Sequence, residues 1–201
     1  MLYYEKKLKK QGCDLIVGVD EAGRGPLAGP VVAAAVILRT SRFKNRIDDS
    51  KKLTSRQREK AFLEIGEKAV FGLGVISEKT IDRLNILVAT RMAMEKAIAG
   101  LMEKIACQEE KHIHVLVDGT NIGLESGFPV TYIIKGDSKS KSIACASIVA
   151  KVTRDRLMSL YDEIFPQYGF LQHKGYPTLA HRRAIERFGL SSIHRNTFCS
   201  V

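Results

Sequence analysis

Four acidic residues of this sequence stand at or near the ends of short apolar segments, where their carboxylates could act together. They are Asp20, Glu21, Asp118 and Asp137. A single acid in such a position is commonly a turn residue or a helix cap. Four carboxylates in one place would instead repel one another and raise one another's pKa values, so the group would need a cation. Because oxygen donors without an obligatory Cys or His suit hard cations, the expected ion is Mg²⁺ or Mn²⁺.

The elements that must position these acids are short strands. Apolar runs bounded by turn residues predict strands over 14–20, 31–38, 70–76, 114–118 and 130–135. In open α/β sheets functional groups gather at strand ends, so neighbouring strands would bring the four carboxylates together. Side chains that are adjacent on a regular strand point to opposite faces, so the chain must bend for both paired acids to reach one site. The glycines that follow them supply that freedom.

Helices alternate with these strands. The pattern predicts helices over 54–68, 79–104, 138–161 and 177–188, and a polar, basic loop over 39–53. The first helix is expected to open with a capping box formed by Thr54 and Gln57. The acid that precedes the third helix could simply cap it. Strands and helices in this order predict an α/β layered domain with a mixed sheet.

A glycine-rich segment, GRGPLAG (23–29), follows the paired acids. Its spacing misses the dinucleotide fingerprint GxGxxG by one residue, and a strand rather than a helix comes next, so that type of nucleotide binding is excluded. No GxxxxGK[ST] motif is present either. The simplest interpretation is a hairpin-type connection. It leaves Arg24 unexplained, because exposed backbone N–H groups beside a guanidinium are well suited to hold phosphate.

Composition narrows the class of protein. Lys and Arg number 32 against 22 Asp and Glu, a net charge of +10 that favours a polyanionic partner, with nucleic acid the first candidate. The longest apolar run, 31–38, is too short to span a bilayer, and the charged stretch MLYYEKKLKK is unlike a signal peptide. We therefore expect a cytoplasmic protein without a membrane partner. No CxxC pair or zinc spacing occurs, so reduced structural thiols are expected at Cys13, Cys107, Cys145 and Cys199.

Motifs spread over nearly the whole chain resemble the bacterial ribonuclease HII family. In chain order they are VDEAGRGPLAGPVVAAAV, DDSKKLT, IDRLNILVATRMAMEKAI, VLVDG, IKGDSKSKSIACASIVAKVTRDR, HKGYPT and HRNTF. The resemblance implies an α/β ribonuclease H-like fold, a mixed central sheet flanked by helices. It also implies a catalytic domain over 1–165 and a small helical C-terminal extension over 166–201 that completes the substrate site.

The resemblance further implies an activity. Members of this family are expected to hydrolyse the RNA strand of RNA–DNA hybrids and to incise DNA at single embedded ribonucleotides, by two-metal-ion hydrolysis with Mn²⁺ or Mg²⁺. The implied partners are RNA–DNA hybrid duplexes and ribonucleotide-containing DNA, acted on by a monomer. Carried over by position, the metal-binding and catalytic carboxylates are Asp20, Glu21, Asp118 and Asp137. The implied junction-reading residues are Gly23, Arg24 and Gly25, together with Tyr176.

Basic residues near the acids are candidates for phosphate contacts. Lys51 lies in the basic loop, within the DSKKL match. Ser147, Lys151 and Arg154 are spaced i, i+4 and i+7 on the third helix and so share one face. This polar stripe could be merely solvated, but on this helix it would emerge beside the metal site. We expect Ser147 and Lys151 to touch phosphate.

Some features stay without a fixed role. His173 lies in a loop and is interpreted as structural or phosphate-contacting rather than as a base, while His194 and Arg195 receive no role. The run 120–124 after the third acid departs from the family pattern and predicts a loop of different shape. Two alternatives remain open: a non-catalytic basic nucleic-acid-binding module, and a nuclease of the same fold that acts on DNA. The first leaves unexplained why acids stand where phosphate should bind.

Overall fold

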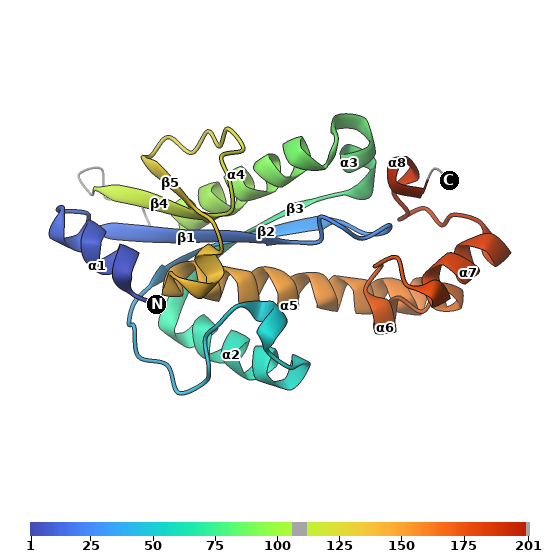
Figure 1. Ribbon diagram of the computed structural model, residues 1–201, viewed down its shortest axis with the longest axis horizontal. Helices are drawn as coiled ribbons and strands as arrows, with labels where there is room; N and C mark the ends of the chain where they lie inside the picture. The colour runs from blue at the N-terminus through green and yellow to red at the C-terminus, as the bar shows by residue number, and fades with distance from the viewer. Residues whose placement is uncertain (106–111, 200–201) are drawn as a thin grey trace.

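A computed structural model describes residues 1–105 and 112–199 as one mixed five-stranded sheet with helices on both faces (Figure 1). The strand order is β3-β2-β1-β4-β5. Strands β1, β2 and β3 pair antiparallel, whereas β4 is parallel to β1 and β5 is parallel to β4. The strands are β1 (Leu15–Ala22), β2 (Val31–Leu38), β3 (Ala69–Ile76), β4 (Ile113–Asp118) and β5 (Val130–Ile133). All five predicted strands and the mixed sheet are confirmed.

Helices form the outer layers, with α3 and α4 on one face of the sheet and α2 and α5 on the other (Figure 1). The α-helices are α1 (Tyr3–Lys10), α2 (Ser55–Lys68), α3 (Glu78–Leu84), α4 (Ile86–Lys104), α5 (Lys141–Ile164), α6 (Phe170–His173), α7 (Leu179–Phe188) and α8 (Asn196–Cys199). Short 3₁₀ turns are η1 (Ser50–Lys52), η2 (Gly136–Ser138) and η3 (Pro166–Tyr168).

Helix boundaries follow local capping chemistry. The capping box is confirmed, because Thr54 Oγ1 accepts from the Gln57 amide and the Thr54 amide donates to Gln57 Oε1. The single helix predicted over 79–104 is wrong: the chain breaks at Asn85, which has φ 74° and caps α4 with its side chain. Helix α1 was not predicted, since its charged face masked the two positions it buries, Glu5 and Leu8.

The acid before α5 is not its cap. Asp137 lies in η2, and the N-cap of α5 is Ser140, whose hydroxyl accepts from the Ile143 amide. Helix α5 runs close against β1 because Gly18 has no side chain: a Cβ there would overlap the backbone of Ser142. This close approach brings the first half of α5 next to the end of β1, where the paired acids lie.

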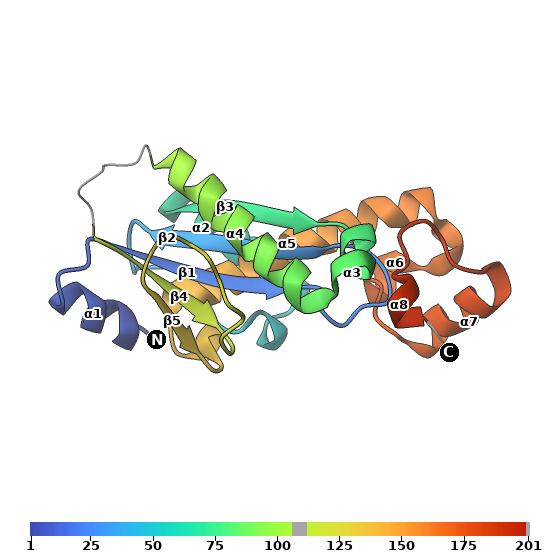
Figure 2. The same cartoon turned by 90° about the horizontal axis from the view of Figure 1, so that it is seen from above.

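The C-terminal segment packs at one end of the sheet, beyond the loop that joins β1 to β2 (Figure 2). It has its own small apolar cluster, which includes Tyr168, Phe170 and Ile193 together with Met158 of α5. Within the described residues no helix is long and apolar enough to cross a membrane. Free thiols are found at Cys13, Cys145 and Cys199, and Cys107 lies outside the described residues.

Candidate active site

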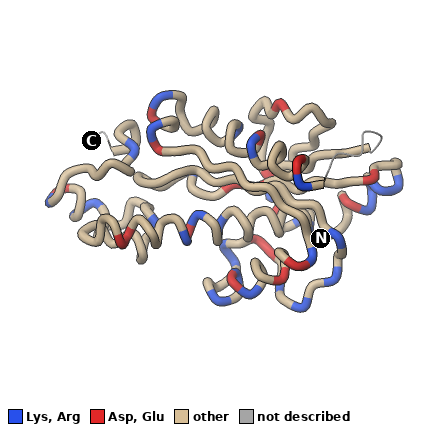
Figure 3. Tube along the Cα trace, turned by 180° about the vertical axis from the view of Figure 1, so that it is seen from behind, with Lys and Arg blue, Asp and Glu red and all other residues tan. Residues whose placement is uncertain are grey.

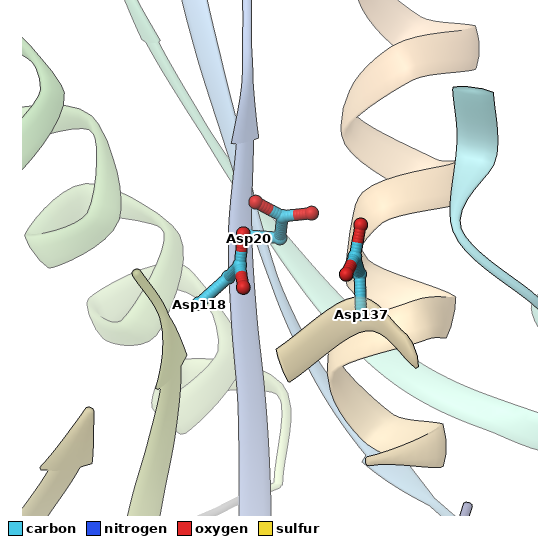
Figure 4. A group of neighbouring side chains, drawn as sticks. All are labelled: Asp20, Asp118 and Asp137. Carbon is cyan, nitrogen blue, oxygen red and sulfur yellow. The ribbon is translucent and has the colours of Figure 1, made fainter. Parts of the chain in front are cut away.

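Three of the predicted carboxylates converge at one edge of the sheet. Asp20 projects from β1, Asp118 from the end of β4 and Asp137 from η2 (Figure 4). One carboxylate oxygen of each lies within 4.8 Å of the others. Because β1 and β4 are parallel and Val19 pairs with Val117, their acids come to the same edge. The strand-end pattern predicted this convergence for four acids, and the structure brings three of them together.

Local hydrogen bonds fix the three side chains. The Gly136 amide donates to Asp118 Oδ1 at 2.6 Å, which ties the end of β4 to η2. The Glu21 amide donates to Asp20 Oδ1 at 2.7 Å, and the Ser147 hydroxyl bonds to the same carboxylate. These hydrogen bonds hold the carboxylates in place. Among the described residues, no cationic side chain forms an ion pair with all three of them.

This cluster is electrostatically unfavourable by itself. Burial raises the pKa of Asp20 well above its ordinary value, and the neighbouring charges of Glu21 and Asp118 raise it further. Burial, with Asp118 and Asp49, raises the pKa of Asp137 to about 6. A divalent cation would remove this repulsion, and the donor set consists of oxygens, as Mg²⁺ and Mn²⁺ prefer. The residues present therefore fit such an ion.

Glu21 lies apart from the three converging acids. Pairing with β2 continues without a bulge through Ala22, so Glu21 is a regular strand residue. Its Oε1 accepts from Arg24 Nη1 at 3.3 Å. Burial raises the pKa of Glu21, and Arg24 opposes that shift. Glu21 nevertheless lines the same pocket as Asp20, because both stand near the open end of β1.

The predicted site residues surround a single pocket of about 700 Å³. All of them except Asp137 line it: Asp20, Glu21, Gly23, Arg24, Gly25, Lys51, Asp118, Ser147, Lys151 and Tyr176. Ser50 was not predicted, although it belongs to the same DSKKL stretch; it lines the pocket, and its Oγ lies 2.9 Å from Ser147 Oγ. Carboxylates together with basic side chains in one pocket are the arrangement expected for a metal site that receives phosphate.

Lys151, one of the basic side chains of the pocket, already has an acidic partner. Lys151 Nζ donates to Asp155 Oδ1 at 2.8 Å, and Arg58 lies 3.8 Å from the other oxygen of that carboxylate. Lys151 Nζ also lies 5.7 Å from the centre of the Tyr176 ring. Around this site, Lys and Arg residues are spread along α2 and the segment before it (Figure 3).

Tyr176 is placed on the rim of the pocket. The residue is 39% exposed, and its ring would be the nearest group to a Cβ placed on Gly25. The aromatic residues that anchor the C-terminal segment are instead Tyr168 and Phe170, which are buried and stacked 5.4 Å apart. The tyrosine ring is thus partly exposed at the pocket, while its carbonyl oxygen accepts from His181 Nδ1 at 3.0 Å.

The histidines of the C-terminal segment are structural. His173 Nε2 lies 2.8 Å from the carbonyl oxygen of Tyr168, and its Nδ1 accepts from the Gly175 amide at 3.2 Å. His194 is buried and its Nε2 lies 3.0 Å from His181 Nε2. None of the three lines the pocket. This placement agrees with the structural interpretation of His173.

The stripe on α5 is only partly polar surface. Ser147 and Lys151 reach the pocket, but Arg154 is completely buried, so the solvated interpretation of that residue is wrong. The i+7 spacing identified the shared face but not that the C-terminal segment covers its far end. Arg195, which had no assigned role, is also completely buried.

Solved structures share this fold. Ribonuclease H2 from Pyrococcus horikoshii superposes with a TM-score of 0.71 at 26% identity, covering 91% of this chain and 93% of that one. Ribonuclease HII from Archaeoglobus fulgidus, solved as a PCNA complex, gives a TM-score of 0.72 at 24% identity, covering 90% of this chain and 94% of that one. The chain therefore has the ribonuclease H-like fold.

Sequence comparison narrows this class to one family. The family model for ribonuclease HII matches residues 17–201. Ribonuclease HII of Ruminiclostridium cellulolyticum is 53% identical over 98% of this chain and 75% of its own length. That of Acholeplasma laidlawii is 50% identical over all of this chain and 95% of its own length. The chain belongs to the ribonuclease HII family, and it is a hydrolase of the ribonuclease H type.

Proposed function

We propose that this protein cleaves the RNA strand of RNA–DNA hybrids, and DNA at single embedded ribonucleotides, by two-metal-ion hydrolysis. The observation that carries the proposal is the convergence of Asp20, Asp118 and Asp137 within 4.8 Å at a pocket that lysines also line. Together with Glu21 these residues would hold two Mg²⁺ or Mn²⁺ ions. When bound, the ions would polarise the phosphate and lower the pKa of the attacking water, so that no histidine base is needed.

Protein side chains would bind and orient the scissile phosphate. Lys51 and Lys151 are the pocket lysines, and Ser147 offers a hydroxyl that already contacts Asp20. Lys151 would exchange its ion pair with Asp155 for the substrate phosphate. Since Asp155 also lies near Arg58, that carboxylate keeps a cationic partner after the exchange.

Recognition of the ribonucleotide is assigned to the loop 23–25 and Tyr176. Only the 2′-OH distinguishes a ribonucleotide within DNA, and that group both donates and accepts hydrogen bonds. The backbone at Gly25 is uncrowded, because the nearest atom to a Cβ there would be Tyr176 Cε1 at 3.9 Å. A flat ring beside a bare backbone suits a ribose, and the tyrosine hydroxyl could meet its 2′-OH.

We further propose a division of labour along the chain. Residues 1–165 would provide the catalytic domain and 166–201 an extension that completes the substrate site, since Tyr176 comes from that extension. We propose that one copy is sufficient for activity and that it acts in the cytoplasm. Size-exclusion chromatography with light scattering should report the mass of a single 22.3 kDa chain.

The function is tested with three matched duplexes, namely all-DNA, RNA–DNA hybrid, and DNA with one ribonucleotide, each with and without Mg²⁺ or Mn²⁺. We expect cleavage of the second and third only, and only with metal. Binding of all three without cleavage would indicate a nucleic-acid-binding module. Cleavage of the all-DNA duplex would indicate a DNA nuclease of the same fold.

A further inference from the structure

Two completely buried arginines lie beneath the loop that joins β1 to β2. Arg154 comes from α5, and Arg195 comes from the segment between α7 and α8. Neither guanidinium forms an ion pair with a carboxylate in the described part of the chain. Taking an ion of this size out of water is strongly unfavourable unless its donors are satisfied. Their presence in the core therefore requires a specific set of acceptors.

Those acceptors are backbone carbonyl groups of the loop. Arg154 donates from Nε to Pro30 O at 3.0 Å, from Nη2 to Ala28 O at 3.0 Å and from Nη1 to Lys174 O at 2.9 Å. Arg195 donates from Nε to Gly29 O at 2.9 Å, from Nη1 to Arg24 O at 3.0 Å, and from Nη2 to Gly23 O at 2.6 Å and Gly29 O at 2.7 Å. The two side chains thus fix the loop 23–30 and the segment that leads to Tyr176.

Other contacts hold the same segments in register. The Leu27 amide donates to Gly175 O at 2.8 Å, and the Arg195 amide donates to Leu27 O at 2.8 Å. The loop also presses directly on one guanidinium, since a Cβ on Gly23 would overlap the Arg154 side chain. The loop 23–30 and the residues just before Tyr176 are therefore positioned by one continuous network of hydrogen bonds.

The direction of these hydrogen bonds decides what the loop offers to a ligand. In a trans peptide group the C=O and the N–H point in opposite directions. Because Arg195 binds the carbonyls of Gly23 and Arg24 on the buried side, the amides of Arg24 and Gly25 point away from it. In the described part of the chain no acceptor pairs with either amide. They are two free donors on residues that line the pocket.

We propose that Arg154 and Arg195 are positioning residues that hold the Arg24 and Gly25 amides, together with Tyr176, ready to bind a backbone oxygen of the substrate at the ribonucleotide. The proposal rests on the function proposed above for the loop 23–25. Neither arginine touches the carboxylates that would hold metal, which are fixed by β1, β4 and η2. The two parts of the site can therefore be perturbed independently.

The direct test compares Arg154→Lys and Arg195→Lys with the wild type. Lysine keeps the charge but lacks the planar fork that serves several carbonyls at once. We expect kcat/KM on the single-ribonucleotide duplex to fall about 10- to 100-fold, since a misplacement of about 1 Å costs about that much. Mn²⁺ affinity, measured by calorimetry without substrate, should stay within about twofold.

Leu101→Ala is the matched control for a loss of stability. Leu101 is completely buried on α4, on the other face of the sheet from α5. Its truncation should lower the melting temperature by several degrees and leave kcat/KM unchanged at a temperature where the variant is folded. The inference is overturned if both Lys variants cleave at the wild-type rate, or if their Mn²⁺ affinity falls in step with cleavage.

A second measurement uses the wild type, in case the Lys variants do not fold. The amide resonances of Arg24 and Gly25 should shift when a ribonucleotide-containing duplex is added with Ca²⁺. The same two resonances should shift less when an all-DNA duplex is added under the same conditions. Unchanged Arg24 and Gly25 resonances would overturn the inference. A wild type that neither binds Mn²⁺ nor cleaves any duplex would overturn the proposed function instead.

Discussion

The carboxylate cluster and the loop 23–30 lie at the same pocket, but they differ in how buried charge is compensated. The cluster consists of carboxylates, whereas the loop is held by two buried arginines. Asp20, Asp118 and Asp137 repel one another and are incompletely compensated by protein groups. Arg154 and Arg195 carry like charges too, yet every donor bond they make ends on a fixed carbonyl. The carboxylate cluster needs a bound cation to compensate its charge, whereas the arginines beneath the loop already have hydrogen-bond acceptors within the protein.

That difference separates two kinds of contribution to activity. A cluster that is unfavourable when empty binds cations strongly, at the expense of the stability of the metal-free protein. A loop whose carbonyls at Gly23 and Arg24 are bonded inward offers amide donors that need no rearrangement when substrate arrives. Four predictions test whether the two regions really differ in this way, from the largest expected effect to the smallest.

Removing charge from the cluster should have the largest effect. Asp20→Asn and Asp118→Asn should each lower the cleavage rate by about 1,000-fold or more, because each loses a ligand of the ions that stabilise the transition state. EDTA should abolish wild-type cleavage while the circular dichroism spectrum stays unchanged. Glu163→Gln removes an exposed carboxylate outside the pocket and should cleave normally. Full activity in either Asn variant would contradict the assignment.

Adding a methyl group should distinguish the two glycines of the loop. Gly23 has φ 99° and its Cβ would overlap Arg154, so Gly23→Ala should cost about 2–4 kcal/mol of unfolding free energy. Gly25 has no such conflict, because the nearest atom to its Cβ would be 3.9 Å away. Gly25→Ala should therefore unfold within about 0.5 kcal/mol of the wild type. Equal losses in chemical denaturation would show that the arginine network does not constrain the loop.

The metal-free cluster should make the protein less stable as pH rises. The pKa of Asp137 is raised to about 6, above the unfolded value near 3.9, so the unfolded chain loses its proton first. The penalty is absent below about pH 4, grows between pH 4 and 6, and is complete above that. In EDTA at pH 8, the unfolding free energy of Asp137→Asn should exceed that of the wild type by about 1–3 kcal/mol. Its melting temperature should therefore be several degrees higher. The two melting curves should coincide near pH 4, and Mn²⁺ should stabilise the wild type more than the variant.

The C-terminal segment should show the opposite pH dependence. A carbonyl can only accept, so His181 Nδ1 donates to Tyr176 O, and His181 Nε2 then accepts from His194 Nε2. The Nδ1 atom of His194 accepts from Ser191, so both rings are neutral. Burial and His181 lower the pKa of His194 to about 4, so the unfolded chain takes up a proton at this residue before the folded protein does. The contribution of neutral His194 to the unfolding free energy is therefore complete above about pH 6.5 and is lost as pH falls toward 4.

The measurement is the melting temperature between pH 7 and 4.5 in wild type, His194→Gln and His112→Gln. The wild type and His112→Gln, whose changed residue is exposed and outside this segment, should lose stability together on acidification. His194→Gln should start lower and lose about 1 kcal/mol less over that range. Parallel curves for all three would mean that this histidine pair does not control the segment.

Much of the fold and the three converging acids could be predicted from the sequence, because they depend on short-range patterns. Apolar runs of strand length, the capping box at Thr54 and an acid after each of several strands are all local signals. The motif match then placed the chain in its family. Even the break at Asn85 has a local cause, a capping side chain inside an otherwise helical pattern.

Only the tertiary structure decided which of these residues meet and which are covered. Spacing placed Arg154 on the face of Ser147 and Lys151, but the segment that buries it lies far along the chain and no periodicity indicates that contact. Glu21 is adjacent to Asp20 in sequence, yet it lies outside the group of three acids. Asp137, which is 117 positions after Asp20, belongs to that group. Side-chain type and spacing determine the chemistry that is available. Burial and the carbonyl groups brought close by folding determine where that chemistry is used.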